Sequence, residues 1–428
     1  MTLRGVFVEI GLHVILVGNL LLYFDALYLA IPLLLLTLAI AFVGLFVGFC
    51  YTGSLLTTSV VSIPFVAIKL QLKWLTLLSS YTFRGFKPTL PEWTFTLELA
   101  IGMTRYIFSE YGRVIVNENA QRVRGPVKSY GEKTLGPSCR EHGTVPEKLV
   151  ANNLEHTWLR DPEKKQHHVV VIHFHGGGYC VSDPLLNVEL GNKTHTKLKQ
   201  ILKKQYSVDV SVDVLLARYR MAPEYLYPTA LNDCFDVFKY VLEHEHIAAN
   251  HVVLSGDSAG AEMAITNCMR LRKESPELQP AAALCYSPVV DFASVGAEEK
   301  TPYCLLTDSF LDNCIPLYLR NVTDADQRRM VSPITHSLRD LPPIFLQWGT
   351  LERFYEQGLR FKAKAEAEGV ANVEFDFLQN MVHDAVMFPA SICPTADKGI
   401  GNACAFAAKH LARVLRADAV NAGPESGP

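Results

Sequence analysis

"LSGDSAGAE", residues 254–262, places Gly256, Ser258 and Gly260 in the pattern G-x-S-x-G, between an apolar run of strand length and a segment with helical spacing. A serine in a sharp strand-to-helix turn exposes its hydroxyl oxygen, and small neighbours let the two elements approach closely. The pattern alone does not identify a nucleophilic serine. The strand before it, the helix after it and a second motif upstream make it informative.

The second motif is "HFHGGGYC", residues 173–180, directly after the apolar run "VVVI". Consecutive glycines weaken helices and strands, but without a Cβ their N–H groups can point at a substrate oxygen. We therefore expect Gly176, Gly177 and Gly178 to form an oxyanion hole. The alternatives are a flexible turn and a phosphate-binding loop, and the second lacks the usual G-x-G-x-x-G or G-x-x-x-x-G-K spacing.

Around these motifs the sequence alternates strands with helices. Several apolar runs are nearly continuous, as expected for strands covered on both faces of a mainly parallel sheet. The alternation predicts a doubly wound α/β core, in which ligands bind at the carboxyl ends of the strands. The expected strands are 169–174, 213–218, 251–256, 281–287, 343–349 and 373–378, and the expected helices are 229–246, 259–273, 354–368 and 401–415.

A serine hydroxyl needs a base to activate it, and the base is oriented by an acid. In the order typical of this turn, both residues follow the serine. Of the three later histidines, His383 comes just past a predicted strand, whereas His336 precedes one and His410 lies in the last helix. We therefore predict His383 as the base.

The acid is expected in the loop after the strand "PIFLQWG". Glu352 is the first carboxylate there, and Glu356, already within the next helix, is the second choice. Asp384 is too close to His383 in sequence to serve easily. The alternative for Glu352 is an acidic residue that complements a helix dipole.

Composition excludes several classes of function. The 428 residues carry a net charge of -3 with a pI near 6.5 and no long basic run, so we expect no nucleic-acid partner. None of the ten cysteines forms a C-x-x-C pair, which argues against zinc and against a thioredoxin-type site. Most should be buried thiols, with one or two disulfides as the alternative in an oxidising compartment. We expect no metal and no cofactor.

The N-terminal region is the most apolar part of the chain. Residues 26–50, "ALYLAIPLLLLTLAIAFVGLFVGFC", would form a helix of about 37 Å, enough to cross a hydrocarbon core of about 30 Å. Residues 10–24 are a shorter apolar segment: a hairpin arm, a re-entrant segment or a signal-like region. We expect an uncleaved anchor of one to three helices within residues 1–69.

The expected location is a membrane, that of the endoplasmic reticulum, with the side left open. Lysines and arginines after the anchor favour the cytoplasmic side. The triplets at Asn192 and Asn321 match glycosylation sequons and would favour the lumen.

The remaining chain is expected to divide into three parts. Residues 70–145 read as an irregular, partly helical cap or linker, with one helix over 91–112 ending on a capping glycine. Residues 146–415 form the catalytic domain, with a cap insertion at about 293–335. Residues 416–428 read as a disordered tail.

With the blocks "RYRMAPEYLYPTALND" (218–233), "SPVVDF" (287–292) and "LPPIFLQWG" (341–349), the chain from about 168 to 412 resembles the hormone-sensitive-lipase branch of the α/β-hydrolases. That branch includes arylacetamide deacetylase and fungal steryl acetyl hydrolase. The resemblance implies an α/β-hydrolase fold with helical cap segments, in which "YRMAPE" braces the sheet and the oxyanion loop. It implies these roles: nucleophile Ser258, base His383, acid Glu352, oxyanion donors Gly176, Gly177 and Ala259, and supporting residues His175 and Gly178.

The chain departs from the family pattern at two places. Where the family usually has "GDSAGGN", Ala261 and Glu262 follow the turn, and the acid position usually holds Asp rather than Glu352. Neither change removes a reacting group.

The resemblance implies hydrolysis of short-chain esters of hydrophobic alcohols, such as sterol acetates or arylacetamide-like compounds. The expected partners are an apolar ester substrate and membrane lipid, with no obligate protein partner. The alternatives are a ligand-binding protein that keeps the fold without catalysis, and an acyltransferase that uses the same residues. Plant hormone receptors of this branch lack the catalytic histidine, whereas His383 is present here.

Overall fold

The computed structural model describes residues 27–297 and 301–421, and the chain divides into two compact units at Phe83. The first unit contains the helices α2 (Leu27–Leu56) and α3 (Ile63–Phe83), joined by the short helix η1 (Val60–Ser62). Segments Leu34–Leu56 and Val60–Phe83 are long and apolar enough to cross a membrane, judged by length and composition. The apolar segment 10–24 lies outside the described residues.

The second unit is built on a mixed sheet with the strand order β1-β2-β4-β3-β5-β6-β7-β8. The β1–β2 and β2–β4 pairs are antiparallel, and all the later pairs are parallel, which confirms the predicted mainly parallel sheet. The strands are β1 (Val145–Ala151), β2 (Leu154–Arg160), β3 (His167–Phe174), β4 (Val210–Ala217), β5 (Val252–Asp257), β6 (Ala282–Tyr286), β7 (Ile344–Gly349) and β8 (Val373–Leu378).

The register of the central strands brings the two glycine motifs together. Phe174, the last residue of β3, pairs with Gly256 near the end of β5. Because the strands are parallel, the loop after Phe174 and the turn after Asp257 leave the sheet at the same edge.

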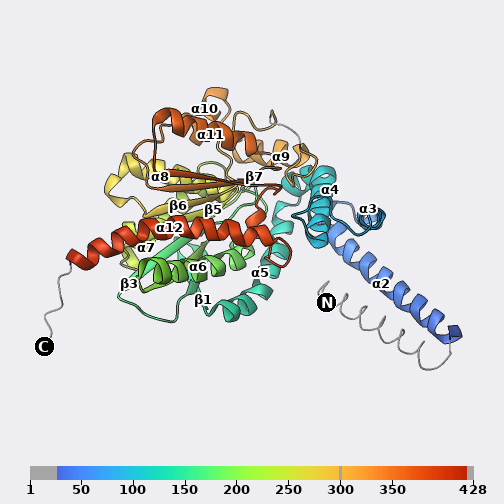
Figure 1. Cartoon of the computed structure of the whole chain (residues 1–428). Coiled ribbons are helices and arrows are strands. Elements are labelled where there is room, and N and C mark those ends of the chain that lie inside the picture. Colours follow the sequence, from blue (N-terminus) through green and yellow to red (C-terminus); the bar gives the residue numbers. More distant parts are fainter. Residues whose placement is uncertain (1–26, 298–300, 422–428) are drawn as a thin grey trace. The chain divides into compact units, whose positions relative to one another are not determined.

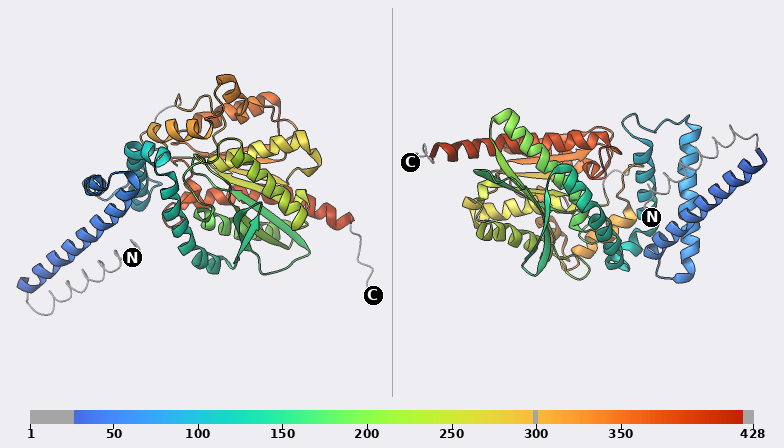
Figure 2. Two further views of the ribbon diagram at one scale, coloured as in Figure 1. Left: turned by 180° about the vertical axis from the view of Figure 1, so that it is seen from behind. Right: turned by 90° about the horizontal axis from the view of Figure 1, so that it is seen from below.

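Helices cover both faces of the sheet (Figures 1 and 2). On one face α6 (Val188–Tyr206) packs against α12 (Pro394–Asn421), and the other face carries α7 (Thr229–His244), α8 (Ala259–Glu274) and α11 (Tyr355–Glu368). The side chains of the central strands are almost fully buried between these layers. Short 3-10 helices lie at η2 (Pro184–Asn187), η3 (Ala249–His251), η4 (Pro276–Leu278), η5 (Pro333–Thr335) and η6 (Ala385–Met387).

Four helices occupy the two segments predicted as cap: α4 (Phe95–Asn117) and α5 (Ala120–His142) in the first, and α9 (Asp308–Tyr318) and α10 (Ala325–Met330) in the second. Residues 70–145, predicted as an irregular, partly helical region, are mostly helical, because α3, α4 and α5 account for most of them. Helix α4 also does not end at Gly112. A Cβ on Gly112 would lie 2.7 Å from the backbone N of Phe310, so this glycine lets α4 pack directly on α9.

All six predicted strands and all four predicted helices are present, and Gly369 caps α11 in a left-handed conformation. The sequence reasoning missed α6 and the β1–β2 hairpin, whose turn residues Asn152 and Asn153 have positive φ. It also placed the tail too early, because α12 continues to Asn421. There His251 bonds Asp418 at 2.7 Å, which holds the last turns on the core.

Candidate active site

The serine motif forms a strained turn between β5 and α8. Ser258 has φ 50° and ψ −114°, a conformation that residues other than glycine rarely adopt. A Cβ on Gly260 would overlap the carbonyl oxygen of Phe174, and a Cβ on Gly256 would overlap the backbone of Gly260. The two glycines of G-x-S-x-G therefore let β5, α8 and β3 meet beside Ser258.

Ser258, His383 and Glu352 form one hydrogen-bonded chain. Ser258 Oγ lies 2.9 Å from Nε2 of His383, and Nδ1 of His383 lies 3.2 Å from Oε1 of Glu352. Each of the three residues is at most 7% exposed. The carboxyl ends of β5, β7 and β8 thus bring together three side chains that are far apart in sequence.

Glu352 is fixed by two further donors. Its Oε2 accepts the backbone N–H of Gly349 at 2.8 Å and the hydroxyl of Ser287 at 2.7 Å. These bonds leave Oε1 directed at His383. Ser287, which opens the block "SPVVDF" and has a positive φ, was not predicted as a site residue.

Of the other residues considered as base or acid, all but one lie outside the hydrogen-bonded chain of Ser258, His383 and Glu352. His336 bonds the carbonyl of Met330 at 2.7 Å, and the ring of His410 packs on Phe406. Glu356 is exposed on α11. Asp384 is the exception, because its Oδ2 lies 3.1 Å from Nε2 of His383.

The ionisation of His383 reflects this acidic surrounding. Burial lowers the pKa of the imidazole, but the carboxylates of Asp384 and Glu352 outweigh burial and raise the pKa of His383 well above its usual value. A base with a raised pKa is a stronger proton acceptor once it is neutral.

The glycine loop lies beside Ser258, but one predicted donor is already used. The N–H of Gly176 donates to Oδ2 of Asp257 at 3.0 Å, so the expectation that Gly176 supplies an oxyanion donor was wrong. Gly177 and Gly178 have φ values of 110° and 58°, a backbone conformation that residues with a Cβ rarely adopt. Within 27–297 and 301–421, no hydrogen bond has the amide of Gly177, Gly178 or Ala259 as its donor.

His175 contacts this loop and Tyr219. Its Nδ1 lies 2.8 Å from the carbonyl oxygen of Gly176, and its ring stacks on Tyr219 at 4.2 Å. The hydroxyl of Tyr219 donates to the carbonyl oxygen of His175 at 2.6 Å. Burial lowers the pKa of His175 to about 4, so it is neutral at physiological pH. These contacts are those of a residue that supports the loop.

The two residues after the serine turn that differ from the family pattern are both buried. Ala261 is fully buried, and Glu262 is 4% exposed. Glu262 accepts hydrogen bonds from Tyr179 at 3.0 Å and from Thr266 at 2.6 Å. Burial raises the pKa of its carboxyl group to about 7. The carboxyl group that follows the turn thus lies in the interior.

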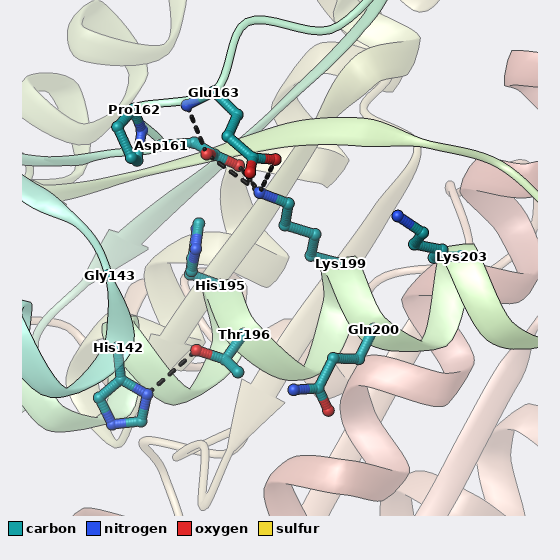
Figure 3. A pocket seen from close by; sticks show the side chains of 10 residues that line it. All are labelled: His142, Gly143, Asp161, Pro162, Glu163, His195, Thr196, Lys199, Gln200 and Lys203. Carbon is teal, nitrogen blue, oxygen red and sulfur yellow. Dashed lines mark hydrogen bonds and ion pairs between the residues drawn. The ribbon is translucent and has the colours of Figure 1, made fainter.

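A cavity of about 390 Å³ lies apart from these residues, between α5, α6 and the loop after β2 (Figure 3). Lys199 bridges Asp161 and Glu163 on its wall, at 2.8 and 3.1 Å. None of its lining residues belongs to the Ser258 chain. No cluster of metal-ligating side chains occurs in the described ranges. All ten cysteines are free and nine are buried, so no disulfide forms.

Known proteins match the same part of the chain. A family model described as alpha/beta hydrolase fold matches residues 171–387, slightly more than half of the chain. An esterase of Acinetobacter venetianus is 31% identical over 243 residues, which cover 56% of this chain and 74% of that protein. An acetyl-hydrolase of Streptomyces hygroscopicus is 30% identical over 229 residues, which cover 53% and 70%.

Solved structures support the same fold. An esterase from the bacterial hormone-sensitive lipase family superimposes with a TM-score of 0.55 at 22% identity, covering 76% of this chain and all of that one. A Pyrobaculum calidifontis esterase gives a TM-score of 0.55 at 18% identity, covering 71% and 97%. At these identities the structural likeness bears on the fold alone.

The sheet order, the strained serine turn and the family match define an α/β hydrolase. Within that class, the chain belongs to the hormone-sensitive-lipase type, a family of carboxylester hydrolases, and is an enzyme of the esterase and lipase kind.

Proposed function

We propose that the chain is a membrane-anchored serine esterase that removes short acyl groups from esters of hydrophobic alcohols. In this proposal Ser258 is the nucleophile, His383 the base and Glu352 the acid. The observation that carries it is the continuous hydrogen-bonded chain from Oγ of Ser258 through both ring nitrogens of His383 to Glu352.

The proposed reaction has two halves. Oγ of Ser258 attacks the ester carbonyl carbon while Nε2 of His383 takes the hydroxyl proton, and the carbonyl oxygen becomes an oxyanion. When the tetrahedral intermediate collapses, His383 returns the proton to the departing alcohol and an acyl-serine remains. Water then repeats the same steps, with His383 as its base, and releases the carboxylic acid and free Ser258.

The amides of Gly177, Gly178 and Ala259 are the proposed oxyanion donors. This set differs from the expected Gly176, Gly177 and Ala259 only in its glycines, and one argument supports each part of it. The Gly176 amide is occupied by Asp257. Ala259 is the first residue of α8, where a backbone N–H has no acceptor within the helix.

The wall beside the glycine loop supports an apolar substrate. A Cβ on Gly178 would lie 3.0 Å from Sγ of Cys314 and 3.2 Å from the ring of Phe310, both on the cap helix α9. Phe310 in turn stacks on Phe108 of α4 at 4.4 Å. Because buried apolar side chains close in on the loop, we propose that the acyl group is short and the alcohol apolar, as in sterol acetates or arylacetamide-like compounds.

Substrate preference and catalysis are tested together with p-nitrophenyl esters of two to twelve acyl carbons. We expect wild type to prefer the short esters and Ser258→Ala to lose activity against all of them. Equal activity of both proteins would end the proposal. Product analysis with an added acceptor alcohol separates hydrolysis from acyl transfer, and failure of a fluorophosphonate to label Ser258 would favour a ligand-binding protein.

Membrane anchoring is part of the proposal, supported by the length and apolar character of α2 and α3. The membrane that we propose is that of the endoplasmic reticulum. Of the two sequons, Asn192 is fully buried and bonds Thr144 and Ser138, so it is closed to glycosylation in the folded protein. Asn321 is exposed. A glycosidase-sensitive shift that is lost in Asn321→Gln would place the catalytic unit in the lumen.

A further inference from the structure

The nitrogen of His383 that faces Ser258 also faces a second oxygen. Nε2 lies 2.9 Å from Oγ of Ser258 and 3.1 Å from Oδ2 of Asp384. With Glu352 at 3.2 Å from Nδ1, the imidazole has a carboxyl group on each side. In the reaction described above, only the one at Nδ1 has a role.

The backbone holds Asp384 in this place. Asp384 has φ 52° and ψ 38°, and its amide donates to Oγ of Ser287 at 3.1 Å. Its carbonyl accepts the amide of Met387 at 2.9 Å, which starts the short helix η6. Ser287 therefore links the acid Glu352 and the residue after the base through one hydroxyl. The contact between Asp384 and His383 does not depend on a mobile surface side chain.

The chemistry of Nε2 depends on its proton. A neutral imidazole with its proton on Nδ1 accepts the hydroxyl of Ser258 at Nε2, and a carboxylate of Asp384 would then face the same lone pair. In an imidazolium, Nε2–H can be shared between Ser258 and Asp384, and the attraction to the carboxylate replaces the repulsion. The geometry therefore favours the protonated ring.

Other charged and titratable groups lie near His383 and Asp384 and affect the protonation of this pair. Glu352 approaches from the loop after β7, Asp257 from the end of β5, and the thiol of Cys304 from the cap insertion. Burial, together with the charges of Asp257 and Glu352, raises the pKa of Asp384 against the lowering effect of His383. Asp384 is the group of this set that shares Nε2 with the serine.

We propose that Asp384 is a positioning residue that sets the pH at which His383 becomes a base. In the free enzyme it holds the Nε2 proton between itself and Ser258, so activity begins at a higher pH than Glu352 and Ser258 alone would require. In the tetrahedral intermediate, His383 has taken the serine proton, and the carboxylate of Asp384 stabilises the resulting imidazolium. Asp384 therefore raises the rate at the pH values where the ring of the free enzyme is neutral. The inference rests on the proposed serine esterase reaction.

The test is the pH profile of kcat/KM for p-nitrophenyl acetate, together with the rate of fluorophosphonate labelling of Ser258. For Asp384→Asn we expect the acid limb of both profiles to move down by about one pH unit, with a lower rate on the alkaline plateau. The two curves would then cross. Glu356→Gln, which removes an exposed carboxylate from α11, is the charge control and should keep the wild-type acid limb.

Each outcome has one meaning. A uniform loss of rate without movement of the acid limb would overturn the role of Asp384, since a purely structural residue gives that result. Asp384→Gly, which suits the left-handed backbone, provides the same measurement if the Asn variant does not fold. An active Ser258→Ala protein would instead overturn the esterase reaction itself.

Discussion

The hydroxyl of Tyr179 donates to a carboxyl oxygen of Glu262 at 3.0 Å, in the interior of the protein. Tyr179 follows the three glycines of the oxyanion loop, and Glu262 lies in the first turn of the helix that begins after Ser258. The bond therefore ties the loop that would hold the oxyanion to the helix that carries the nucleophile. The family pattern "GDSAGGN" has asparagine where this chain has Glu262.

We expect Glu262→Gln to stabilise the protein at alkaline pH. Burial raises the pKa of Glu262 in the folded state to about 7, against 4.5 as its ordinary value. Between these values the folded state binds more protons than the unfolded state, so stability falls as the pH rises through this range. The cost above pH 7 is about 3 kcal/mol. Glutamine removes the charge, and its oxygen can accept from one of the two hydroxyls while its NH2 group donates to the other.

Thermal unfolding of the full chain in detergent at pH 5, 6.5 and 8 checks this expectation. The advantage of Glu262→Gln should grow with pH and nearly vanish at pH 5. Glu356→Gln reports the effect of losing an exposed charge and should show no such growth. A difference that is the same at all three values would contradict a buried, neutral Glu262.

The strain at Ser258 makes a second prediction. Its φ of 50° is unfavourable for every residue with a Cβ, so Ser258→Ala keeps the strain and Ser258→Gly releases it. Both variants should be inactive. The glycine variant should be the more stable of the two by about 1 kcal/mol, measured by thermal unfolding. Equal stability would mean that the turn is not strained.

The strands and helices of the core could be predicted from the sequence. The core strands are covered on both faces and are therefore continuous apolar runs, and the core helices have a regular apolar spacing. It failed where that signal is absent. Strand β1 is largely exposed, and its first four residues carry no buried pattern. Helix α6 has lysines and polar residues around a narrow apolar stripe. Gly112 resembled a helix cap, but it marks a helix–helix contact with α9, which is nearly 200 residues later in the chain.

The candidate active site could likewise be predicted only in part. The order of Ser258, Glu352 and His383 along the strands was enough to predict that they meet. The sequence could not show that Asp257 captures the amide of Gly176, because that bond depends on the register of β3 with β5. Sequence proximity also argued against Asp384, yet its left-handed backbone turns the carboxylate back onto Nε2.

Glu352 and Ser287 should differ in their effects on catalysis. In Glu352→Gln the side-chain amide can donate to Nδ1 of His383, which leaves the ring proton on Nε2 and removes the acceptor for Ser258. We expect kcat to fall by about 10³-fold or more. Ser287→Ala keeps the carboxylate but removes one of its donors, so a loss of about 10-fold is expected. Steady-state kinetics with p-nitrophenyl acetate distinguish the two, and a larger loss in Ser287→Ala would contradict Glu352 as the acid.

Two glycines of the second unit provide a matched test of the turn geometry. A Cβ on Gly260 would overlap the carbonyl oxygen of Phe174 and lie 2.8 Å from that of His175, and both are backbone atoms that cannot swing aside. Gly260→Ala should therefore push β3 away from α8, destabilise the protein by about 2 kcal/mol and displace the glycine loop. A Cβ on Gly401, within α12, would meet no neighbouring atom within 4 Å, so Gly401→Ala should be neutral or stabilising by up to about 1 kcal/mol.

Thermal unfolding and esterase activity measured on both variants test this difference between Gly260 and Gly401. Full activity in Gly260→Ala would show that close contact between β3 and the nucleophile helix is not needed to align the amides with Ser258.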